Sequence, residues 1–307
     1  MTSYVLAIDL GKTGCRASLR AEGRQIRYAE GVGAPGLAAA GGVDAARHAI
    51  GTVLETIDPP DGFALFVGAA GAASAPEAAA QLARQLAEHA GASTTAVTSD
   101  AVTAHAGALG GSPGVVLAAG TGTVATAVDD AGRFTRVDGW GPLLGDEGSG
   151  GWIGLEGLRA ALRAHDGRGP HTALVAAVGE CYAITPGELP SFLGQQENPA
   201  LTAARFAPAV AAAATDDDTA AAIMTAAGRA LGRSVLAAIE RSGLRPPVPY
   251  ALTGGLGNLG PALLHPLDRL IDGAVDRRTP LGQPIDGAAL LAEATATALE
   301  SLIIRIR

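Results

Sequence analysis

The chain has 307 residues, which is enough for two domains that each bury a core of their own. Apolar residues make up 48% of it, and 43 glycines and 18 prolines interrupt them throughout, which is typical of an α/β protein with tight turns. The formal net charge of -8, without a basic cluster, argues against a nucleic-acid partner and against an anionic membrane surface, because both require clustered Lys and Arg.

The cysteine content and the absence of a targeting pattern indicate a cytoplasmic protein. Cys15 and Cys181 are too few for a disulfide framework or an iron–sulfur site. Residues 1–11 have neither a basic region nor an apolar stretch as long as a signal peptide needs, and no later segment reaches about 18 apolar residues without charge, Gly or Pro. We therefore expect a cytoplasmic protein that does not bind membranes.

The first part of the chain begins with a predicted β-meander. An apolar run at 4–10 ends at a glycine turn, and two short strands follow around a second turn at Glu22 and Gly23. Strands and helices then alternate, with a helix at 42–57, a strand at 63–71, a helix at 75–90, a strand near 94–98 and a helix from Asp100 to about 109.

Residues 114–128 repeat the opening in outline, with an apolar strand, a turn of Gly and Thr, and an alternating strand. Two such units indicate two copies of one domain plan. The second copy continues with a glycine-rich loop at 139–151, helices near 152–164, 201–214 and 219–242, a strand at 249–253 and a helix after Gly260. We expect domains at 1–110 and 111–286, and a segment at 287–307 whose helix, at about 287–303, packs back on the first domain.

The first glycine turn follows a buried strand and begins after Asp9. Gly11 permits a sharp reversal, and the backbone amides of Gly11, Lys12 and Thr13 are then placed to approach an anionic ligand such as a phosphate. Lys12 is the only lysine in the chain. Asp9 is a candidate ligand for Mg²⁺, which accepts one or two carboxylates and keeps several waters. An ordinary hairpin turn has the same composition, so this turn alone leaves both interpretations open.

The second glycine turn, Gly120-Thr121-Gly122-Thr123, also matches the start of the dinucleotide fingerprint of a Rossmann dehydrogenase. That fingerprint requires a helix directly after the turn. The residues that follow alternate β-branched side chains and end in a polar turn, so they predict a hairpin instead. A hairpin tip with these hydroxyls and amides is suited to hold a second side of a triphosphate.

Asp100 lies where a predicted strand passes into a helix, between the two glycine turns. An Asp in that place often caps the helix. A carboxylate facing a nucleotide also serves as the catalytic base that accepts the proton of a substrate hydroxyl during phosphoryl transfer. We favour Asp100 as both catalytic base and substrate contact.

The loop at 139–151 concentrates glycine around Trp140 and two adjacent acids. Carbohydrate sites use such groups, because carboxylates and exposed amides bond to hydroxyls. The candidate sugar contacts are Gly139, Trp140, Gly141, Asp146 and Glu147. As an alternative, Asp146 or Ser149 caps the next helix and Trp140 packs in the core.

The loop Gly139-Trp140-Gly141 with Gly145-Asp146-Glu147-Gly148-Ser149, together with the two turns, resembles the N-acetylglucosamine kinases and the wider BadF/BadG/BcrA/BcrD ATPase family. The resemblance covers essentially the whole chain. It implies an α/β fold of the actin-like ATPase (ribonuclease H-like) type, with two similar domains and a central cleft for ATP and Mg²⁺. The implied reaction is phosphorylation of the 6-hydroxyl of N-acetylglucosamine.

The resemblance also implies roles for single residues. Thr13 and Thr121 are similar to the ATP phosphate contacts, and Asp100 is similar to the catalytic base. The stretch from Thr253 to Asn258, with Gly254 and Gly255, resembles the family's adenosine turn. The family's kinases usually carry a sugar-binding Asn after the third strand, but residues 31–43 contain none, so another group must replace it.

Three other functions stay open. The segments 13–17, 148–150 and 166–172 also resemble bacterial glucosamine kinases. A non-kinase ATPase that drives a partner would need cluster-binding cysteines, and a sugar-sensing module would bind sugar without turnover. We expect an amino sugar as the small-molecule partner, and a homodimer.

Overall fold

The computed structural model describes residues 4–294, 297 and 299–306, which fall into two compact units. Unit 1 combines the residues up to Gly114 with Val128–Phe134 and the residues from Thr279 onward, and unit 2 combines Val115–Ala127 with Thr135–Arg278. The predicted ranges 1–110, 111–286 and 287–307 were contiguous, whereas each unit is assembled from separate segments.

Unit 1 is built on a mixed sheet in the order β11-β5-β4-β1-β2-β3. Its strands are β1 (Tyr4–Leu10), β2 (Gly14–Ala21), β3 (Arg24–Val32), β4 (Ala64–Ala69), β5 (Thr94–Ser99) and β11 (Ile304–Ile306). β1, β4 and β5 are parallel, and β2, β3 and β11 join them as antiparallel neighbours. The predicted meander of the first three strands is confirmed.

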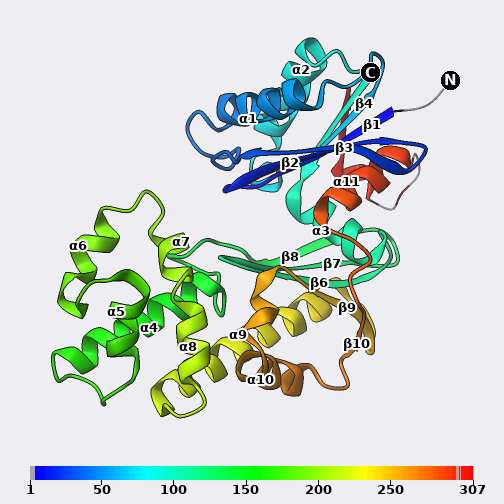
Figure 1. Ribbon diagram of the computed structural model, residues 1–307. Coiled ribbons are helices and arrows are strands. Elements are labelled where there is room, and N and C mark those ends of the chain that lie inside the picture. The colour runs from blue at the N-terminus through cyan, green and yellow to red at the C-terminus, as the bar shows by residue number, and fades with distance from the viewer. Residues whose placement is uncertain (1–3, 295–296, 298, 307) are drawn as a thin grey trace. The chain divides into compact units, whose positions relative to one another are not determined.

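Helices cover both faces of the unit 1 sheet. Successive residues of a strand point to opposite faces, and in this sheet the residues on each face are apolar. Leu6 and Ile8 pack with α1 (Gly42–Ile57) and α2 (Pro76–His89), whereas Ala7 packs with α3 (Asp100–Leu109) and α11 (Pro284–Glu293). Figure 1 shows α1 and α2 together on one side of this sheet. The 3-10 turns η1 (Ala72–Ser74) and η4 (Glu300–Leu302) complete the unit.

The predicted C-terminal helix at 287–303 is wrong in its extent. α11 begins at Pro284, where Gln283 forms a capping box with Asp286, and it ends at Glu293. Gly287 lets α11 approach α3 so closely that a Cβ there would overlap the carbonyl oxygen of Thr103. Within 294–307, the described residues form η4 and then β11, which pairs with β5.

Unit 2 is built on a sheet in the order β10-β9-β6-β7-β8. Its strands are β6 (Gly114–Ala119), β7 (Thr123–Val128), β8 (Phe134–Asp138), β9 (Val248–Thr253) and β10 (Val275–Arg277). β6, β9 and β10 run parallel. The helices α9 (Asp218–Ser242) and α10 (Pro261–Ile271) contribute to the core of this unit, in which Tyr250 of β9 is fully buried.

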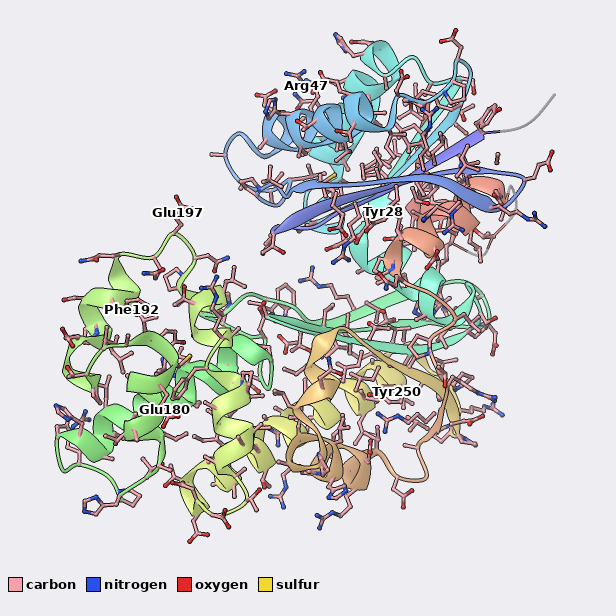
Figure 2. All side chains as sticks on the ribbon, viewed as in Figure 1. Tyr28, Arg47, Glu180, Phe192, Glu197 and Tyr250 are labelled. Carbon is pink, nitrogen blue, oxygen red and sulfur yellow. The ribbon has the colours of Figure 1, made fainter. Side chains whose placement is uncertain are left out.

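The remaining helices of unit 2 gather around α4, as the green ribbons of Figure 1 show. They are α4 (Gly150–His165), α5 (Leu174–Tyr182), α6 (Leu189–Gly194), α7 (Pro199–Ala204) and α8 (Ala207–Ala213), with the 3-10 turn η2 (Pro186–Glu188). Phe192, labelled in Figure 2, lies here with its ring centroid 5.1 Å from that of Tyr182. The predicted helix at 201–214 is two helices, separated at Arg205 and Phe206.

Among the described residues, α9 is a helix long and apolar enough to cross a membrane by length and composition alone. Of the 18-residue stretch of α9 that meets this criterion, 50% is buried inside the protein. A buried core helix meets the same criterion, so this finding is weak support for a membrane span.

Candidate active site

In unit 1, Asp9 and Asp100 lie at the same edge of the sheet. β1 and β5 are parallel to β4, so their carboxyl ends meet at one edge, where ligands bind in open α/β sheets. The side chain of Asp9 is 13% exposed. Burial raises the pKa of Asp9 from 3.8 to about 6, the guanidinium of Arg16 opposes this, and the charge of Asp100 adds to it. The two carboxylates are therefore close enough to interact.

A row of charged residues crosses the strands beside this pair. Arg16 of β2 is the register partner of Asp9 of β1 and of Glu30 of β3. Its guanidinium lies 3.6 Å from Asp9 Oδ2 and 3.7 Å from Glu30 Oε1. The hydroxyl of Tyr28, seen in Figure 2, donates to Glu30 at 2.5 Å. The edge thus carries alternating charges rather than an apolar surface.

The first glycine turn connects β1 to β2. Gly11 N–H donates to Gly14 O at 2.9 Å, and Ala34 N–H donates to Gly11 O at 3.2 Å. A Cβ at Gly33 would come within 2.5 Å of Gly11 O and Gly14 N, so the backbone packs against the turn there. Lys12 and Thr13 are exposed at the tip.

Asp100 is the first residue of α3, but it does not cap it. The cap is Ser99, whose hydroxyl accepts from Val102 N–H at 3.3 Å. The alternative in which Asp100 served as the cap is therefore wrong. Asp100 Oδ1 accepts from the adjacent Ala101 N–H at 2.9 Å, and the side chain is half-buried.

In unit 2, the second glycine turn leads into strand β7, so the predicted hairpin is confirmed and the Rossmann alternative fails. Gly120 N–H donates to Gly122 O at 2.9 Å. The turn rests on the start of α4, because Gly150 N–H donates to Gly120 O at 2.8 Å and Gly151 N–H to Thr121 O at 2.9 Å. The first amides of α4 thus anchor the turn.

The side chains of the second turn have different surroundings. Thr123 is buried, and its hydroxyl donates to Ala118 O at 3.2 Å, so it fixes the shape of the hairpin. Thr121 is half-buried. The hydroxyl of Ser149 accepts from Trp152 N–H at 3.2 Å and caps α4, as one of the two alternatives for this loop predicted.

The loop that follows β8 presents Trp140 to solvent. Its side chain is 68% exposed, so the alternative that placed it in the core is wrong. Asp146 has a left-handed φ of 55°. Its Oδ1 accepts from Gly141 N–H at 3.3 Å, and its Oδ2 would lie 2.7 Å from a Cβ at Gly122. The structure therefore brings Asp146 to the second turn, while Glu147 is exposed.

Asp138 was missed by the sequence analysis. Its Oδ1 accepts from Asp146 N–H at 2.8 Å, and its Oδ2 accepts from Glu147 N–H at 3.2 Å. Asp138 has a left-handed φ of 63° at the end of β8. An Asp directly before a glycine at a strand end was the signal for such a turn.

The predicted adenosine turn lies at the end of β9 and continues into the 3-10 turn η3 (Gly255–Leu259). Gly254 has a φ of 85°, and a Cβ there would overlap Ala119 O, so the turn packs against the end of β6. Because β6 and β9 are parallel, this turn and the Gly120 turn lie at one edge of the sheet. Gly254, Gly255 and Asn258 are exposed.

No group of three or more His, Cys, Asp or Glu residues that could enclose a metal ion occurs in the described part of the chain. Asp9 and Asp100 provide hard oxygen donors at one edge. This donor set fits Mg²⁺, which needs few protein carboxylates when phosphates and waters complete its shell.

Comparisons with known proteins give similarity over most of the chain at the level of family and fold. Residues 6–292 match the family described as BadF/BadG/BcrA/BcrD ATPase. A crystal structure of a candidate N-acetylglucosamine kinase from Chromobacterium violaceum superposes with a TM-score of 0.75 and 28% identity, covering 95% of this chain and 99% of that one. A ROK family glucokinase from Streptomyces griseus, solved with glucose and AMPPNP, has a TM-score of 0.53 and 19% identity over 94% and 99%, and shares the fold.

Two curated relatives match over shorter segments. The N-acetylmuramic acid/N-acetylglucosamine kinase of Clostridium acetobutylicum is 41% identical over 78 residues, which cover 25% of this chain and 26% of the relative. The N-acetyl-D-glucosamine kinase of Dictyostelium discoideum is 41% identical over 93 residues, 30% of this chain and 29% of the relative. The chain thus matches less than a third of either relative's length.

Proposed function

Since the chain belongs to the BadF/BadG/BcrA/BcrD ATPase family, we propose that it is an ATP-dependent kinase that phosphorylates the 6-hydroxyl of N-acetylglucosamine. Its two-unit α/β architecture is that of the actin-like ATPases and sugar kinases. The names of the curated relatives and of the Chromobacterium structure support this sugar.

The position of Asp9 and Asp100 at the same carboxyl edge of the unit 1 sheet is the observation that carries the proposal. In our account Asp100 accepts the proton of the sugar hydroxyl as its oxygen attacks the γ-phosphoryl group. Asp9 is the residue that holds Mg²⁺, which neutralises charge on the phosphates when it is bound. Arg16 lies 3.6 Å from Asp9 and keeps positive charge near this carboxylate.

The glycine turns supply the remaining contacts of the proposal. Thr13 and the amide of Lys12 bind phosphate on the unit 1 edge, and Thr121 with the remaining amides of its turn binds phosphate on the unit 2 edge. Gly11 and Gly120 shape their turns instead, because their amides already donate to Gly14 O and Gly122 O. Thr123 contributes through its backbone, because its hydroxyl is already bonded to Ala118 O. Gly254, Gly255 and Asn258 hold the adenosine.

The sugar contacts of the proposal are on the loop after β8. Gly139 and Gly141 offer backbone groups, Trp140 an exposed ring, and Asp146 a carboxylate. Glucosamine is the alternative substrate that one observation favours: Asp146 and Glu147 add two carboxylates to this loop, and a carboxylate would pair with a free ammonium.

An ADP-release assay with a panel of sugars tests the proposal. We expect ADP formation with N-acetylglucosamine and none with its 6-deoxy analogue, which has no attacking hydroxyl. Glucosamine, N-acetylmannosamine, N-acetylmuramic acid and glucose rank the alternatives. ADP release at the same rate without sugar would overturn the kinase and support a non-kinase ATPase.

Lys12 allows an independent test of the ATP contact. It is the only lysine in the chain and is exposed at the tip of the first turn, so an amine-reactive reagent has one side-chain target besides the α-amino group. We expect ATP with Mg²⁺ to slow its labelling, as read by peptide mass spectrometry. Labelling at an unchanged rate with saturating ATP would contradict the contact.

A further inference from the structure

Two alternate residues of β8, Arg136 and Asp138, hold opposite ends of the loop at 139–147. Asp138 binds the end of the loop through the amides of Asp146 and Glu147, at 2.8 and 3.2 Å. Arg136 binds its beginning, since its Nε donates to Asp138 O at 3.1 Å and its Nη2 donates to Gly139 O. We refer to Arg136 and Asp138 as the β8 clamp.

Arg136 also lies over the ring of Trp140. Its guanidinium carbon is 5.2 Å from the ring centroid, which is within the range of a cation–π contact. The backbone oxygen of Arg136 in turn accepts from Arg241 Nη1 of α9 at 3.3 Å. One side of the Trp140 ring is thus covered by the Arg136 guanidinium, while Trp140 remains 68% exposed.

The loop needs such support, because its own side chains do not bury it. Leu143 is 94% exposed and Leu144 is 86% exposed, so the loop tip has little apolar contact to fix it. Asp146 takes a left-handed φ of 55°, a backbone conformation that L-residues disfavour unless other contacts hold it. The hydrogen bond from the Asp146 amide to Asp138 Oδ1 is such a contact.

We propose that the β8 clamp positions Trp140 and Asp146 for sugar binding, so that Arg136 and Asp138 determine sugar affinity without touching the sugar. The inference rests on the function proposed above. A loop that is ordered before the sugar arrives does not have to be ordered at the moment of binding, and the affinity rises by the free energy saved. Arg136 and Asp138 are therefore positioning residues.

Asp138→Gly is the sharpest variant. Glycine adopts the left-handed φ of this position freely, so the backbone is kept and only the carboxylate is lost. We expect the KM for the sugar to rise about 10- to 100-fold, because two hydrogen bonds from backbone amides and the order of the loop are lost. The KM for ATP should stay within about 2-fold of the wild-type value. Asp138→Asn keeps one acceptor but turns a donor toward the second amide, so an intermediate rise is expected.

Arg136 is tested in the same way. Arg136→Lys keeps a positive charge near Trp140 but loses the fork that spans the two carbonyl oxygens. We expect a rise of about 3- to 10-fold in the KM for the sugar, and a larger rise for Arg136→Met. In a Trp152→Phe background Trp140 is the only tryptophan, so its fluorescence reports sugar binding directly.

Asp129 provides a matched control. Its Oδ1 accepts from Ala131 N–H at 3.0 Å and Arg133 N–H at 2.8 Å, in the turn at the other end of β8. Asp129→Gly therefore loses the same kind of hydrogen bonds outside the loop, and we expect it to leave the KM for the sugar unchanged. A rise equal to that of Asp138→Gly would overturn the clamp, because the effect would then be a general loss of stability.

Amide hydrogen exchange separates failure of the clamp from failure of the proposed function. We expect Asp138→Gly to speed exchange in the peptide that contains 139–147, with exchange in α9 unchanged. Unchanged exchange in the peptide that contains 139–147, or an unchanged KM for the sugar in Asp138→Gly, overturns the clamp. In a different outcome, the wild-type protein neither binds nor phosphorylates any sugar of the panel, while exchange is still faster in Asp138→Gly than in wild type. That result would contradict the kinase proposal and leave only the support of the loop by the β8 clamp.

Discussion

The two glycine turns close alike but are supported differently. In both, the first glycine amide donates to a carbonyl oxygen at 2.9 Å. The turn at Gly11 lies beside charged side chains, with Asp9, Arg16 and Asp100 at the same edge of unit 1. The turn at Gly120 instead rests on the backbone of α4, and glycines make the close approach possible.

This difference predicts that substitutions at the unit 1 edge mainly affect activity and that substitutions at the unit 2 edge mainly affect folding. Charged residues at the unit 1 edge are partly desolvated, which disfavours the folded state, so their removal should abolish activity and leave the fold intact or stabilised. At the unit 2 edge Gly254 is needed for packing, so a single methyl group at this position should harm the fold.

The largest effect is expected for Asp100→Asn. Loss of the proposed base should lower kcat by about 10²- to 10⁴-fold, while sugar binding, read from Trp140 fluorescence, changes little. Asp44→Asn is the matched control, because Asp44 also lies in the first turn of a unit 1 helix. A kcat within 2-fold of the wild-type value, on about the same protein stability, would remove Asp100 from the chemistry.

Gly254 and Gly255 test the unit 2 edge as a pair. A Cβ at Gly254 would overlap Ala119 O at a φ of 85°, whereas a Cβ at Gly255 meets no atom within 4 Å. We expect Gly254→Ala to lower the free energy of unfolding by about 2–4 kcal/mol and Gly255→Ala by less than about 0.5 kcal/mol. Urea unfolding measures both, and equal losses would contradict the close packing of this turn.

Asp9→Asn should stabilise the protein as activity is lost. The pKa of Asp9 in the folded state, about 6, lies above the ordinary 3.8, so the folded state binds the proton more tightly. The contribution of Asp9 to the free energy of unfolding is therefore fully present below pH 3.8 and is lost as the pH rises through about 6. The full loss is about 3 kcal/mol. Asn carries no charge and avoids this loss. Thermal unfolding at pH 5 and pH 8 should show the variant's advantage growing with pH, and a lower Tm than wild type at pH 8 would refute the sign.

The smallest effects are expected for the two helix caps. Ser99 and Ser149 each accept from the third amide of their helix, at 3.3 and 3.2 Å. Replacement by Ala should cost about 1 kcal/mol at either site. Only Ser149→Ala should also raise the KM for ATP, because α4 carries the Gly120 turn. An equal KM in both variants would show that the turn does not depend on this cap.

Much of the fold followed from local patterns in the sequence. The strand at 4–10, the hairpin after Gly120 and the long helix at 219–242 were predicted, because hydrophobic periodicity and β-branched alternation are local signals. β11 was missed, since a strand of three residues is defined by its partner β5 and not by its own composition.

The site followed only in part. Residue type and position pointed to Asp9 and Asp100, which the structure places at one edge. Ser99 was overlooked as the cap of α3 because the adjacent Asp has the same preference. Asp138 and Arg136 were overlooked because their role depends on which amides and carbonyls the folded loop turns toward them. Such contacts leave no periodic trace in a sequence.

The position of the transferred phosphate on the sugar is the decisive test of the proposed kinase activity. The purified protein is incubated with ATP, Mg²⁺ and N-acetylglucosamine, and the product is examined by phosphorus–proton correlation NMR. We expect a new phosphorus signal coupled to the two protons on C6 of the sugar, which forms at least about 100-fold more slowly with Asp100→Asn. A signal coupled to another carbon's proton, or free phosphate without a sugar phosphate, would contradict it.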